Sequence, residues 1–419
     1  MLFFHPLKLI HWNFVIPSRS RLATPLTIRY IMTHEPNCSL NAAPPLRPTN
    51  SWCVTAAWDE VSNKVISQNV DYPFQTINEK ILDLTTSPDW MEYLEISEHR
   101  SEESGGAGAY DTFRCDLILQ GTGQRQLWRI WGQDFHLNRI EESYRSIAKD
   151  VDSGSLTNAR NKSELIIQEL LMKASTSPTL LQCENISSGN AMFQLIRMTL
   201  LWSSTNGEIT VRGHSCCSGS ALLLDEPVQP IVVSVAAKQH GKQIDIDTAM
   251  PSRVDDPRHK VASWTRLRKQ MERPETYKPP GVSEVLMLRS ARDHQLEVLE
   301  GLSSNVFVVY KDGTLRTATD GVLFGYARHL VLECAESCGL RLDPFKSIIL
   351  QDAEEGLWKE AFITSSSRLI YPISKIIIHK DNEMEFKDYW TYESNGEKAK
   401  WQQLLDEILK RADAEITAV

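Results

Sequence analysis

Residues 296–310 read LEVLEGLSSNVFVVY, which is the most informative stretch of the chain. Two runs rich in β-branched and aromatic residues flank a short polar turn, a pattern typical of largely buried strands. Glu300 stands at the end of the first run, where a buried carboxylate is costly unless a cation meets it. The stretch by itself leaves open whether Glu300 is such an acid or faces solvent from a hairpin turn. On these residues alone, the solvent-facing turn is favoured.

Three further blocks accompany this stretch. Residues 258–260 read RHK, residues 320–328 read DGVLFGYAR, and residues 361–368 read AFITSSSR. In this order the four blocks resemble the class IV (fold type IV) aminotransferases, a family that includes branched-chain and D-amino acid aminotransferases and aminodeoxychorismate lyase. The pattern LEG-x-x-S-N-x-F-V-V is the most specific mark of the resemblance. The resemblance spans roughly residues 108–372, with gaps, and is strongest after Lys260.

The resemblance implies a two-domain α/β (α+β) fold of type IV. A small N-terminal α/β domain would precede a larger C-terminal pseudo-barrel α/β domain, with the site in the cleft between them. We expect residues 1–50 to be a leader and linker, residues 51–225 the small domain, and residues 230–419 the cofactor-binding domain. The boundary is placed at residues 224–230 because the sequence DEPVQP breaks regular structure there.

The amino-acid composition indicates which classes of partner and which cell compartments are to be expected. The chain has 419 residues and a net charge of −9, which argues against nucleic acid or an anionic membrane as the main partner. Its eight cysteines form no paired CxxC motif and indicate reduced, intracellular thiols. Residues 1–33 hold four basic residues and no acidic one. This composition resembles a transit peptide to the plastid or mitochondrion. Alternatively, Met32 is the true start and the protein is cytoplasmic.

Periodicity and turn residues predict the elements between the motifs. Helices are expected at residues 135–147, 163–174 (with Ser163 as N-cap), 325–338 and 401–409. Strands are expected at residues 51–62, 191–202, 208–214, 230–237, 283–288, 345–351 and 360–363. Residues 213–220 are expected to form a loop. The sequence has no apolar run long enough to predict a membrane-spanning helix.

The resemblance also implies the residues that bind pyridoxal 5′-phosphate. Lys260 lies where the family has its Schiff-base lysine, and burial near other cations would lower its pKa enough for it to lose a proton. Glu300 would bind the pyridine nitrogen of the cofactor. The protonated nitrogen would then be the cation that a buried carboxylate at this position needs. If residues 258–260 are considered without the other three blocks, Lys260 is best explained as a lysine exposed to solvent.

The phosphate group of the cofactor would meet a helix N-terminus and several side chains. The family pattern L-x-G-I-T-R reads LFGYAR here, so Tyr326 and Ala327 stand at the phosphate loop and a hydroxyl contact is lost. Backbone N–H groups at a helix N-terminus still favour an anion. Residues 135–140, FHLNRI, resemble the H-L-x-R-L helix of the family, which assigns Arg139 to the phosphate. Ser365 and Ser366 lie where the family has further hydroxyl groups.

Residues 108–114, GAYDTFR, resemble the segment that the family places at the mouth of the site. This assigns Tyr110 and Arg114 to the substrate, because a guanidinium fork suits an α-carboxylate. A surface position on a strand is the alternative for Arg114. The spelling is similar to that of the lyase, which has Thr where Asp111 stands. No metal site is predicted.

Three functions remain open at this point. The first is a class IV aminotransferase that moves an amino group between a small amino acid and a 2-oxo acid, as a homodimer. The second is aminodeoxychorismate lyase, which gives 4-aminobenzoate and pyruvate from the same proton abstraction. The third is a non-catalytic paralogue that binds ligands. Thr265 stands where branched-chain members carry Tyr, which argues against a close match to those enzymes.

Overall fold

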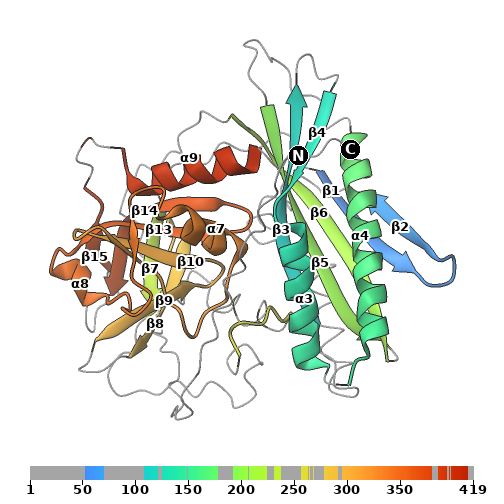
Figure 1. Ribbon diagram of the computed structural model, residues 1–419, viewed down its shortest axis with the longest axis horizontal. Helices are drawn as coiled ribbons and strands as arrows, with labels where there is room; N and C mark the ends of the chain where they lie inside the picture. Colours follow the sequence, from blue (N-terminus) through green and yellow to red (C-terminus); the bar gives the residue numbers. More distant parts are fainter. Residues whose placement is uncertain are drawn as a thin grey trace, which may run out of the picture.

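The computed structural model describes residues 52–69, 108–120, 125–148, 150–177, 192–205, 207–223, 231–236, 256–262, 264, 268, 278–290, 295–379, 386–393, 396 and 398–413. The expected leader at residues 1–50 and the domain boundary at residues 224–230 lie outside these ranges. The described residues form two sheets with helices packed against each (Figure 1). In the described part of the chain, no helix combines the length and apolar character that crossing a membrane requires.

The first sheet has six strands in the order β2-β1-β6-β5-β3-β4, and every neighbouring pair is antiparallel. Helices α3 and α4 lie side by side along this sheet (Figure 1). The strands are β1 (Trp52–Asp59), β2 (Lys64–Asn69), β3 (Ala109–Gln120), β4 (Arg125–Ile130), β5 (Met192–Thr205) and β6 (Glu208–Leu223), and the helices are α3 (Gln133–Ile147) and α4 (Ser153–Ser175). The strands expected at residues 191–202 and 208–214 are confirmed as β5 and β6, which pair as an antiparallel hairpin.

Two expectations for this half were wrong. Helix α4 begins at Ser153, with the Asp152 side chain accepting from the Ser155 backbone N–H at 2.9 Å, so Ser163 is not its N-cap. Ser163 lies inside the helix, where its hydroxyl donates to the carbonyl of Ala159. Residues 213–220 belong to β6 and not to a loop. Gly213 is needed there because a Cβ would lie 2.4 Å from the Ile166 side chain of α4.

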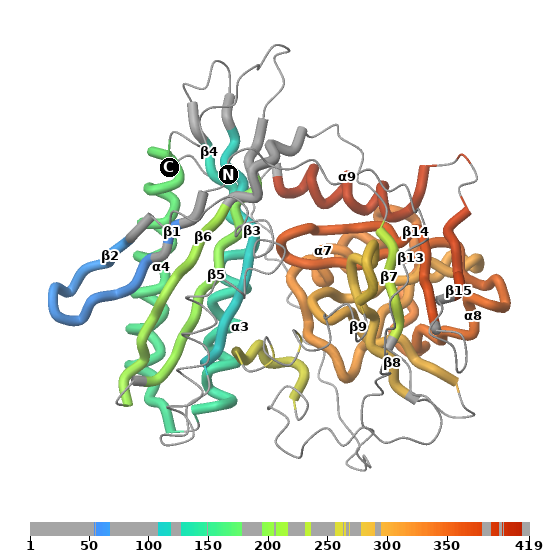
Figure 2. Tube along the Cα trace, turned by 180° about the vertical axis from the view of Figure 1, so that it is seen from behind, coloured from blue at the N-terminus to red at the C-terminus, as the bar shows by residue number. Residues whose placement is uncertain are grey.

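The second sheet has nine strands, and part of it closes on itself. Its order is β12-β11-β10-β13-β14-β7-β8-β9, with β15 beside β14, and a further pairing of β9 with β10 closes a barrel. Figure 2 shows this half from behind, with α9 along one side. The strands are β7 (Ile231–Ala236), β8 (Glu284–Ser290), β9 (Leu296–Gly301), β10 (Asn305–Tyr310), β11 (Thr314–Arg316), β12 (Arg341–Leu342), β13 (Trp358–Ser365), β14 (Leu369–His379) and β15 (Phe386–Thr391), and the helices are α7 (Tyr326–Cys334), α8 (Gln351–Glu354) and α9 (Lys400–Asp413).

The stretch at residues 296–310 forms β9 and β10, as its residue pattern predicts. The two strands pair only at Glu300 and Asn305, because β10 is otherwise paired with β13 and β11. Glu300 therefore lies at the seam where the barrel closes. It is 2% exposed, which excludes the solvent-facing interpretation.

The strand expected at residues 345–351 is absent. Ile349 makes one isolated bridge to Glu297, and α8 begins at Gln351. Ile348 is nonetheless fully buried, and its carbonyl accepts from the Val298 backbone N–H at 2.8 Å. The apolar pattern of this segment thus reflects packing against β9 without a ladder of strand hydrogen bonds.

Candidate active site

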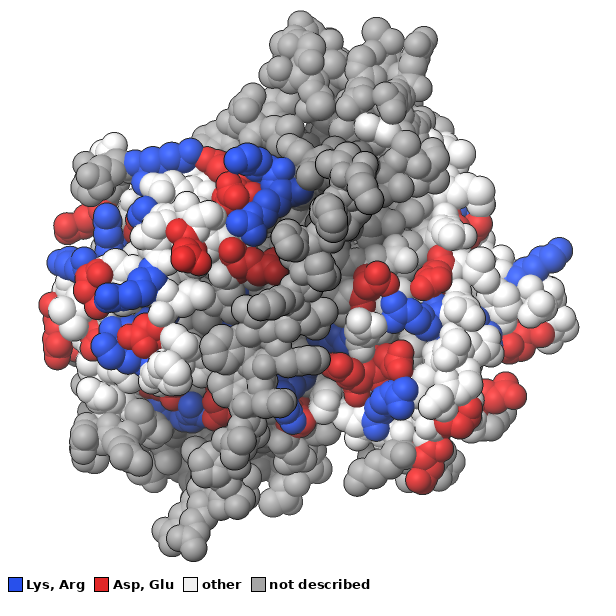
Figure 3. Space-filling view, in the orientation of Figure 1, with Lys and Arg blue, Asp and Glu red and all other residues white. Residues whose placement is uncertain are grey.

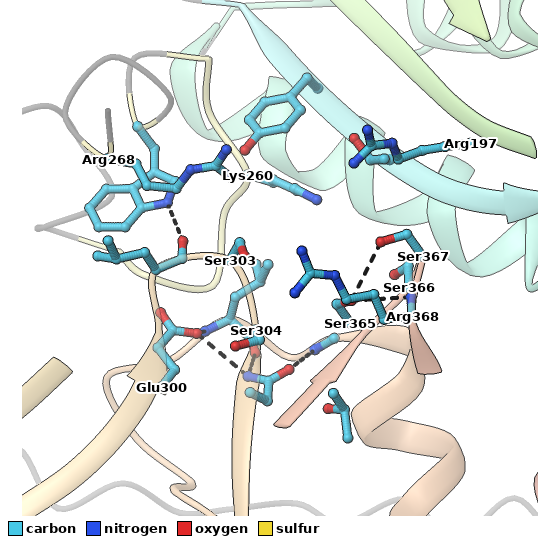
Figure 4. Close-up of a pocket in the computed structure, with 18 of the residues that line it drawn as sticks. Arg197, Lys260, Arg268, Glu300, Ser303, Ser304, Ser365, Ser366, Ser367 and Arg368 are labelled. Atoms are coloured by element: carbon cyan, nitrogen blue, oxygen red, sulfur yellow. Dashed lines mark hydrogen bonds between the residues drawn. The ribbon is translucent and has the colours of Figure 1, made fainter. Parts of the chain in front are cut away.

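A cavity of about 130 Å³ lies between the two halves of the molecule (Figure 4). Strands β3 and β5 and helix α3 of the first half line it, together with β9, β10 and β13 of the second half. Its wall is rich in cations. The basic residues that line it are Arg139, Arg197, Lys260, Arg268, Lys278 and Arg368, and Glu300 is the one acid among the described lining residues.

The first half of the molecule holds the backbone of Lys260. Its carbonyl accepts from the Tyr110 backbone N–H at 3.0 Å, and its own N–H donates to the Ser143 hydroxyl of α3 at 2.9 Å. The Lys260 side chain is 16% exposed, and its Nζ lies 3.5 Å from the Asp111 carboxylate and 5.0 Å from the Tyr110 ring centroid. The amine is thus placed in the cavity beside an acid and an aromatic face.

Asp111 lies between two cations, Lys260 and Arg139 of α3, and contacts both. Its carboxylate accepts from Nε and Nη2 of Arg139 at 2.7 and 2.6 Å, and it lies 3.2 Å from Nδ1 of His136. Burial is the largest single influence and would raise the pKa of Asp111, but Arg139, His136 and Lys260 together outweigh it and hold the pKa well below its ordinary value. Asp111 is therefore ionised and offsets the charge of Arg139.

The environment of His136 keeps it neutral. Burial lowers its pKa from 6.5 to about 4, although the neighbouring Asp111 acts in the opposite direction. The His136 ring stacks on Phe113, with ring centroids 5.2 Å apart. His136 therefore packs as a neutral side chain on the buried face of α3.

Hydrogen bonds from the segment before α7 position Glu300. Its Oε2 accepts from the Leu323 backbone N–H at 3.0 Å, and the Asn305 amide bridges the same region by donating to the Leu323 carbonyl at 2.6 Å. Arg328 is the nearby cation. Burial lowers the pKa of Arg328 to about 10, while Glu300 acts to raise it. Glu300 is therefore a buried carboxylate with a defined orientation at the edge of the cavity (Figure 4).

A turn rich in hydroxyl groups follows β13 on another wall. The Ser365 hydroxyl accepts from the Arg368 backbone N–H at 3.3 Å, and Ser366 also lines the cavity. Thr364 is 1% exposed and lines the cavity too, yet its hydroxyl has no hydrogen-bond partner among the described residues. An unsatisfied buried hydroxyl is costly, so this wall fits a ligand that offers acceptor oxygens.

The structure brings most of the predicted site residues together. The cavity is lined by Tyr110, Arg139, Lys260, Glu300, Ser365 and Ser366. The side chains of Arg114, Tyr326 and Ala327 lie elsewhere.

Arg114 differs from the prediction because it is buried and pairs with Asp116 at 2.5 Å, away from the cavity. Tyr326 packs against Phe135 and His136, with ring centroids 5.3 and 5.4 Å away, and Ala327 lies on the buried face of α7. A role for the backbone of these two residues at the start of α7 stays a prediction.

Sequence reasoning missed Asp111, Arg197, Thr364 and Arg368. A signal existed for two of them, because Thr364 and Arg368 belong to the block AFITSSSR. Arg197 is the cross-strand partner of Arg114, so both project from the same face of the sheet. Only the fold shows which of the two faces the cavity.

Comparison with known proteins places this chain in a family. The family model "Amino-transferase class IV" matches residues 108–376. The chain belongs to the class IV aminotransferases. The family membership confirms the resemblance and the type IV fold expected from the sequence. Among curated proteins, none matches this class IV aminotransferase.

Several solved structures are similar to this chain. The T.th. branched-chain amino acid aminotransferase with pyridoxamine 5′-phosphate is 15% identical, with a TM-score of 0.49 over 74% of this chain and 89% of that one. The fold IV transaminase CpuTA1 from Curtobacterium pusillum is 17% identical, with a TM-score of 0.46 over 87% of this chain and 99% of that one. The branched-chain amino acid aminotransferase from Thermobaculum terrenum in its PLP form is 17% identical, with a TM-score of 0.46 over 74% of this chain and 88% of that one.

Proposed function

We propose that this chain moves an amino group between a small amino acid and a 2-oxo acid, with Lys260 as the group that carries the proton. Class IV aminotransferases are pyridoxal 5′-phosphate enzymes, so family membership confirms the cofactor expected from the sequence. The observation that carries the proposal is the arrangement of one cavity, in which the Lys260 amine, a buried Glu300 and a turn of hydroxyl groups face the same space.

The residues of the cavity fit this cofactor. Thr364 offers an unsatisfied hydroxyl, which suits a phosphate oxygen, and the hydroxyl-bearing residues Ser365 and Ser366 also line the cavity. Lys260 would supply the amine that the cofactor aldehyde binds. Glu300 would hold the pyridine nitrogen in its protonated form, because a buried carboxylate favours a positive charge beside it.

The protein's own residues then perform the proton transfers. When bound, pyridoxal 5′-phosphate supplies an electron-withdrawing ring that stabilises negative charge at the substrate Cα. Lys260 would accept the Cα proton at its Nζ and return it, acting in turn as general base and general acid. Asp111, 3.5 Å from that Nζ, favours the protonated amine after the first transfer, since a nearby negative charge stabilises a cation. Tyr110 borders the amine with its ring and limits the directions of approach.

An absorbance spectrum tests this proposal. Purified wild-type protein with added pyridoxal 5′-phosphate should show the band of a lysine-bound cofactor, and a reactive amino acid should convert it to the band of the amine form. Lys260→Ala should lose the first band. Lys278→Ala, which removes a second lysine of the same cavity, should keep it. Folded wild-type protein without a band, or a band that persists in Lys260→Ala, would remove Lys260 from the proposal.

The lyase alternative uses the same residues and differs in outcome. Tyr110 and Thr112 of the GAYDTFR segment line the cavity, which is the observation that keeps this candidate open. If aminodeoxychorismate yields 4-aminobenzoate and pyruvate while amino acids leave the band unchanged, the protein is the lyase. A stoichiometric cofactor with turnover of either substrate excludes the non-catalytic paralogue. Assembly as a homodimer and the compartment inside the cell stay predictions from the sequence.

A further inference from the structure

The side chain of Asn305 holds the segment that leads into α7, and the proposed reaction assigns it no role. Asn305 opens β10 and lies opposite Glu300 where the barrel closes. It is 5% exposed and lines the cavity. Its Nδ2 donates to the Leu323 carbonyl at 2.6 Å, and its Oδ1 accepts from the Gly325 backbone N–H at 3.2 Å. One amide thus binds the backbone on both sides of Phe324.

The contacts at this position require an amide. The Leu323 carbonyl only accepts hydrogen bonds and the Gly325 N–H only donates, so the orientation of the Asn305 amide is fixed. An ionised aspartate in its place would offer acceptors alone. It would also put a second carboxylate beside Glu300, whose Oε2 lies 3.5 Å from the Asn305 nitrogen. Gly325 is matched to the amide, because a Cβ there would lie 2.4 Å from Asn305 Oδ1.

The segment 323–325 is hydrogen-bonded to residues of both halves. Its first N–H donates to Glu300 at 3.0 Å, and its middle carbonyl accepts from Nη1 of Arg139 of α3 at 3.1 Å. Its last residue, Gly325, is the N-cap of α7. The position of this segment therefore sets both the orientation of the Glu300 carboxylate and the place where α7 begins.

The placement of neutral donors matters for an anionic cofactor in this chain. Basic and acidic side chains of the described residues are interspersed over both halves of the face shown in Figure 3, so this face directs an anion to no single place. Inside, Arg139 is offset by Asp111 through two hydrogen bonds. Affinity for a phosphate therefore depends also on backbone N–H groups, and those at a helix N-terminus suit an anion.

We propose that Asn305 is a positioning residue that sets the two ends of the cofactor site together: Glu300 at the pyridine ring and the start of α7 at the phosphate. The inference rests on the proposed function, in which Glu300 meets the pyridine nitrogen. Asn305 acts through the segment 323–325, so its loss should disturb both ends at once. A residue that only stabilised the barrel would lower the stability of the fold and leave both ends of a bound cofactor unchanged.

Two measurements on the bound cofactor test the two ends without any turnover. The phosphate end is measured as the ratio of the affinities for pyridoxal 5′-phosphate and for pyridoxal, which lacks the phosphate. The ring end is measured by ¹⁵N NMR of bound, ring-labelled cofactor, as the pH at which the pyridine nitrogen loses its proton. Asn305→Ala should reduce the affinity ratio on the order of 10-fold. It should also lower that pH by about one unit, a tenfold change in the protonation equilibrium, because a misplaced carboxylate favours the protonated nitrogen less.

Further variants separate positioning from simple loss of the fold. Gly325→Ala keeps Asn305 but displaces its oxygen, and φ of −74° at this position suits any residue, so both measurements should shift as in Asn305→Ala. Asn305→Asp should reduce the affinity ratio at pH 8 and recover toward wild type at lower pH, because a protonated carboxyl donates and accepts as an amide does. Asn138→Ala removes an exposed amide that pairs with Arg160 and should leave both measurements unchanged. Circular dichroism checks the fold of each variant.

The outcomes separate this inference from the proposed function. Wild-type values at either end, in folded Asn305→Ala or Gly325→Ala protein that forms the cofactor band, overturn the role of Asn305 and leave the aminotransferase standing. A pyridine nitrogen without its proton in wild type at pH 7 overturns the assignment of Glu300 and this inference together. If wild type forms no cofactor band, the proposed reaction falls, and calorimetry with inorganic phosphate then tests Asn305 alone. Weaker phosphate binding by Asn305→Ala supports its effect on α7, and equal binding overturns it.

Discussion

The charge state of His136 makes the stability of this fold depend on pH. Burial lowers the pKa of the histidine to about 4, so it stays neutral in the folded chain down to that pH. In the unfolded chain it takes up a proton as the pH falls through about 6.5. Between these values the unfolded state binds more protons, and the free energy of unfolding therefore falls as the pH is lowered.

The size of the effect follows from the two pKa values. The interval between 6.5 and about 4, at about 1.4 kcal/mol per pH unit, corresponds to a loss of about 3 kcal/mol by pH 4. The side chain of His136 is fully buried, so solvent screens little of this effect. His136→Asn should remove the titration, while the amide can still donate to Asp111 in place of Nδ1.

Urea unfolding followed by tryptophan fluorescence at pH 7, 6, 5 and 4.5 measures the effect. Wild type should lose stability on acidification by up to about 3 kcal/mol more than His136→Asn. His329→Asn controls for the loss of a histidine, because this side chain is 53% exposed on α7, and it should follow wild type. Parallel curves for wild type and His136→Asn would refute the argument that burial keeps His136 neutral.

Three further substitutions and one control test particular contacts of the fold by urea unfolding. Asp111→Asn should destabilise the fold by about 3–5 kcal/mol at pH 7, because it leaves the buried guanidinium of α3 without its acid. The difference should persist to pH 4, since the folded pKa lies well below the unfolded one and the contribution is lost only as the pH falls through it. Gly132→Ala should cost at least about 1–3 kcal/mol, because φ is +63° and a Cβ would lie 2.4 Å from the Tyr326 ring. Gly207→Ala, at φ +83° with nothing within 4 Å, shows the backbone part alone and should cost less. Glu360→Ala should cost about 1–2 kcal/mol and reduce helical circular dichroism, because this carboxylate accepts from the first two backbone N–H groups of α9.

Local patterns predicted the elements that decide the fold. β9 and β10 follow from their apolar runs, and α3 follows from Leu137, Ile140 and Tyr144, which are all buried. The patterns failed where a residue serves a distant neighbour. The sequence predicts Gly213 to be a loop residue, but in the structure it is the position where α4 packs closely on β6. The sequence predicts Ser163 to be an N-cap, but its hydroxyl accepts a hydrogen bond from Trp202 at 2.8 Å.

In the site, too, some residues could be predicted from local patterns and others depend on distant neighbours. Lys260 and Glu300 could be placed from motifs, because the order of the blocks along the chain fixes them. The roles of the charged residues around Lys260 and Glu300 could not be predicted from motifs, because these roles depend on which side chains form ion pairs in the folded chain. Asp116 pairs with Arg114, whereas Arg197, the cross-strand partner of Arg114, lines the cavity. A sequence gives the inventory of charges, whereas the fold decides which of them are already neutralised.

The backbone contacts of Lys260 have a consequence for protein engineering. Both main-chain hydrogen-bonding groups of this lysine are held by the first half of the molecule, whereas Glu300 is held by the barrel. A chimera that replaced the first sheet by that of a relative would therefore shift the amine while leaving the carboxylate in place. Tyr110 and Ser143 would therefore have to be transferred together with Lys260, because they form the hydrogen bonds that hold its backbone.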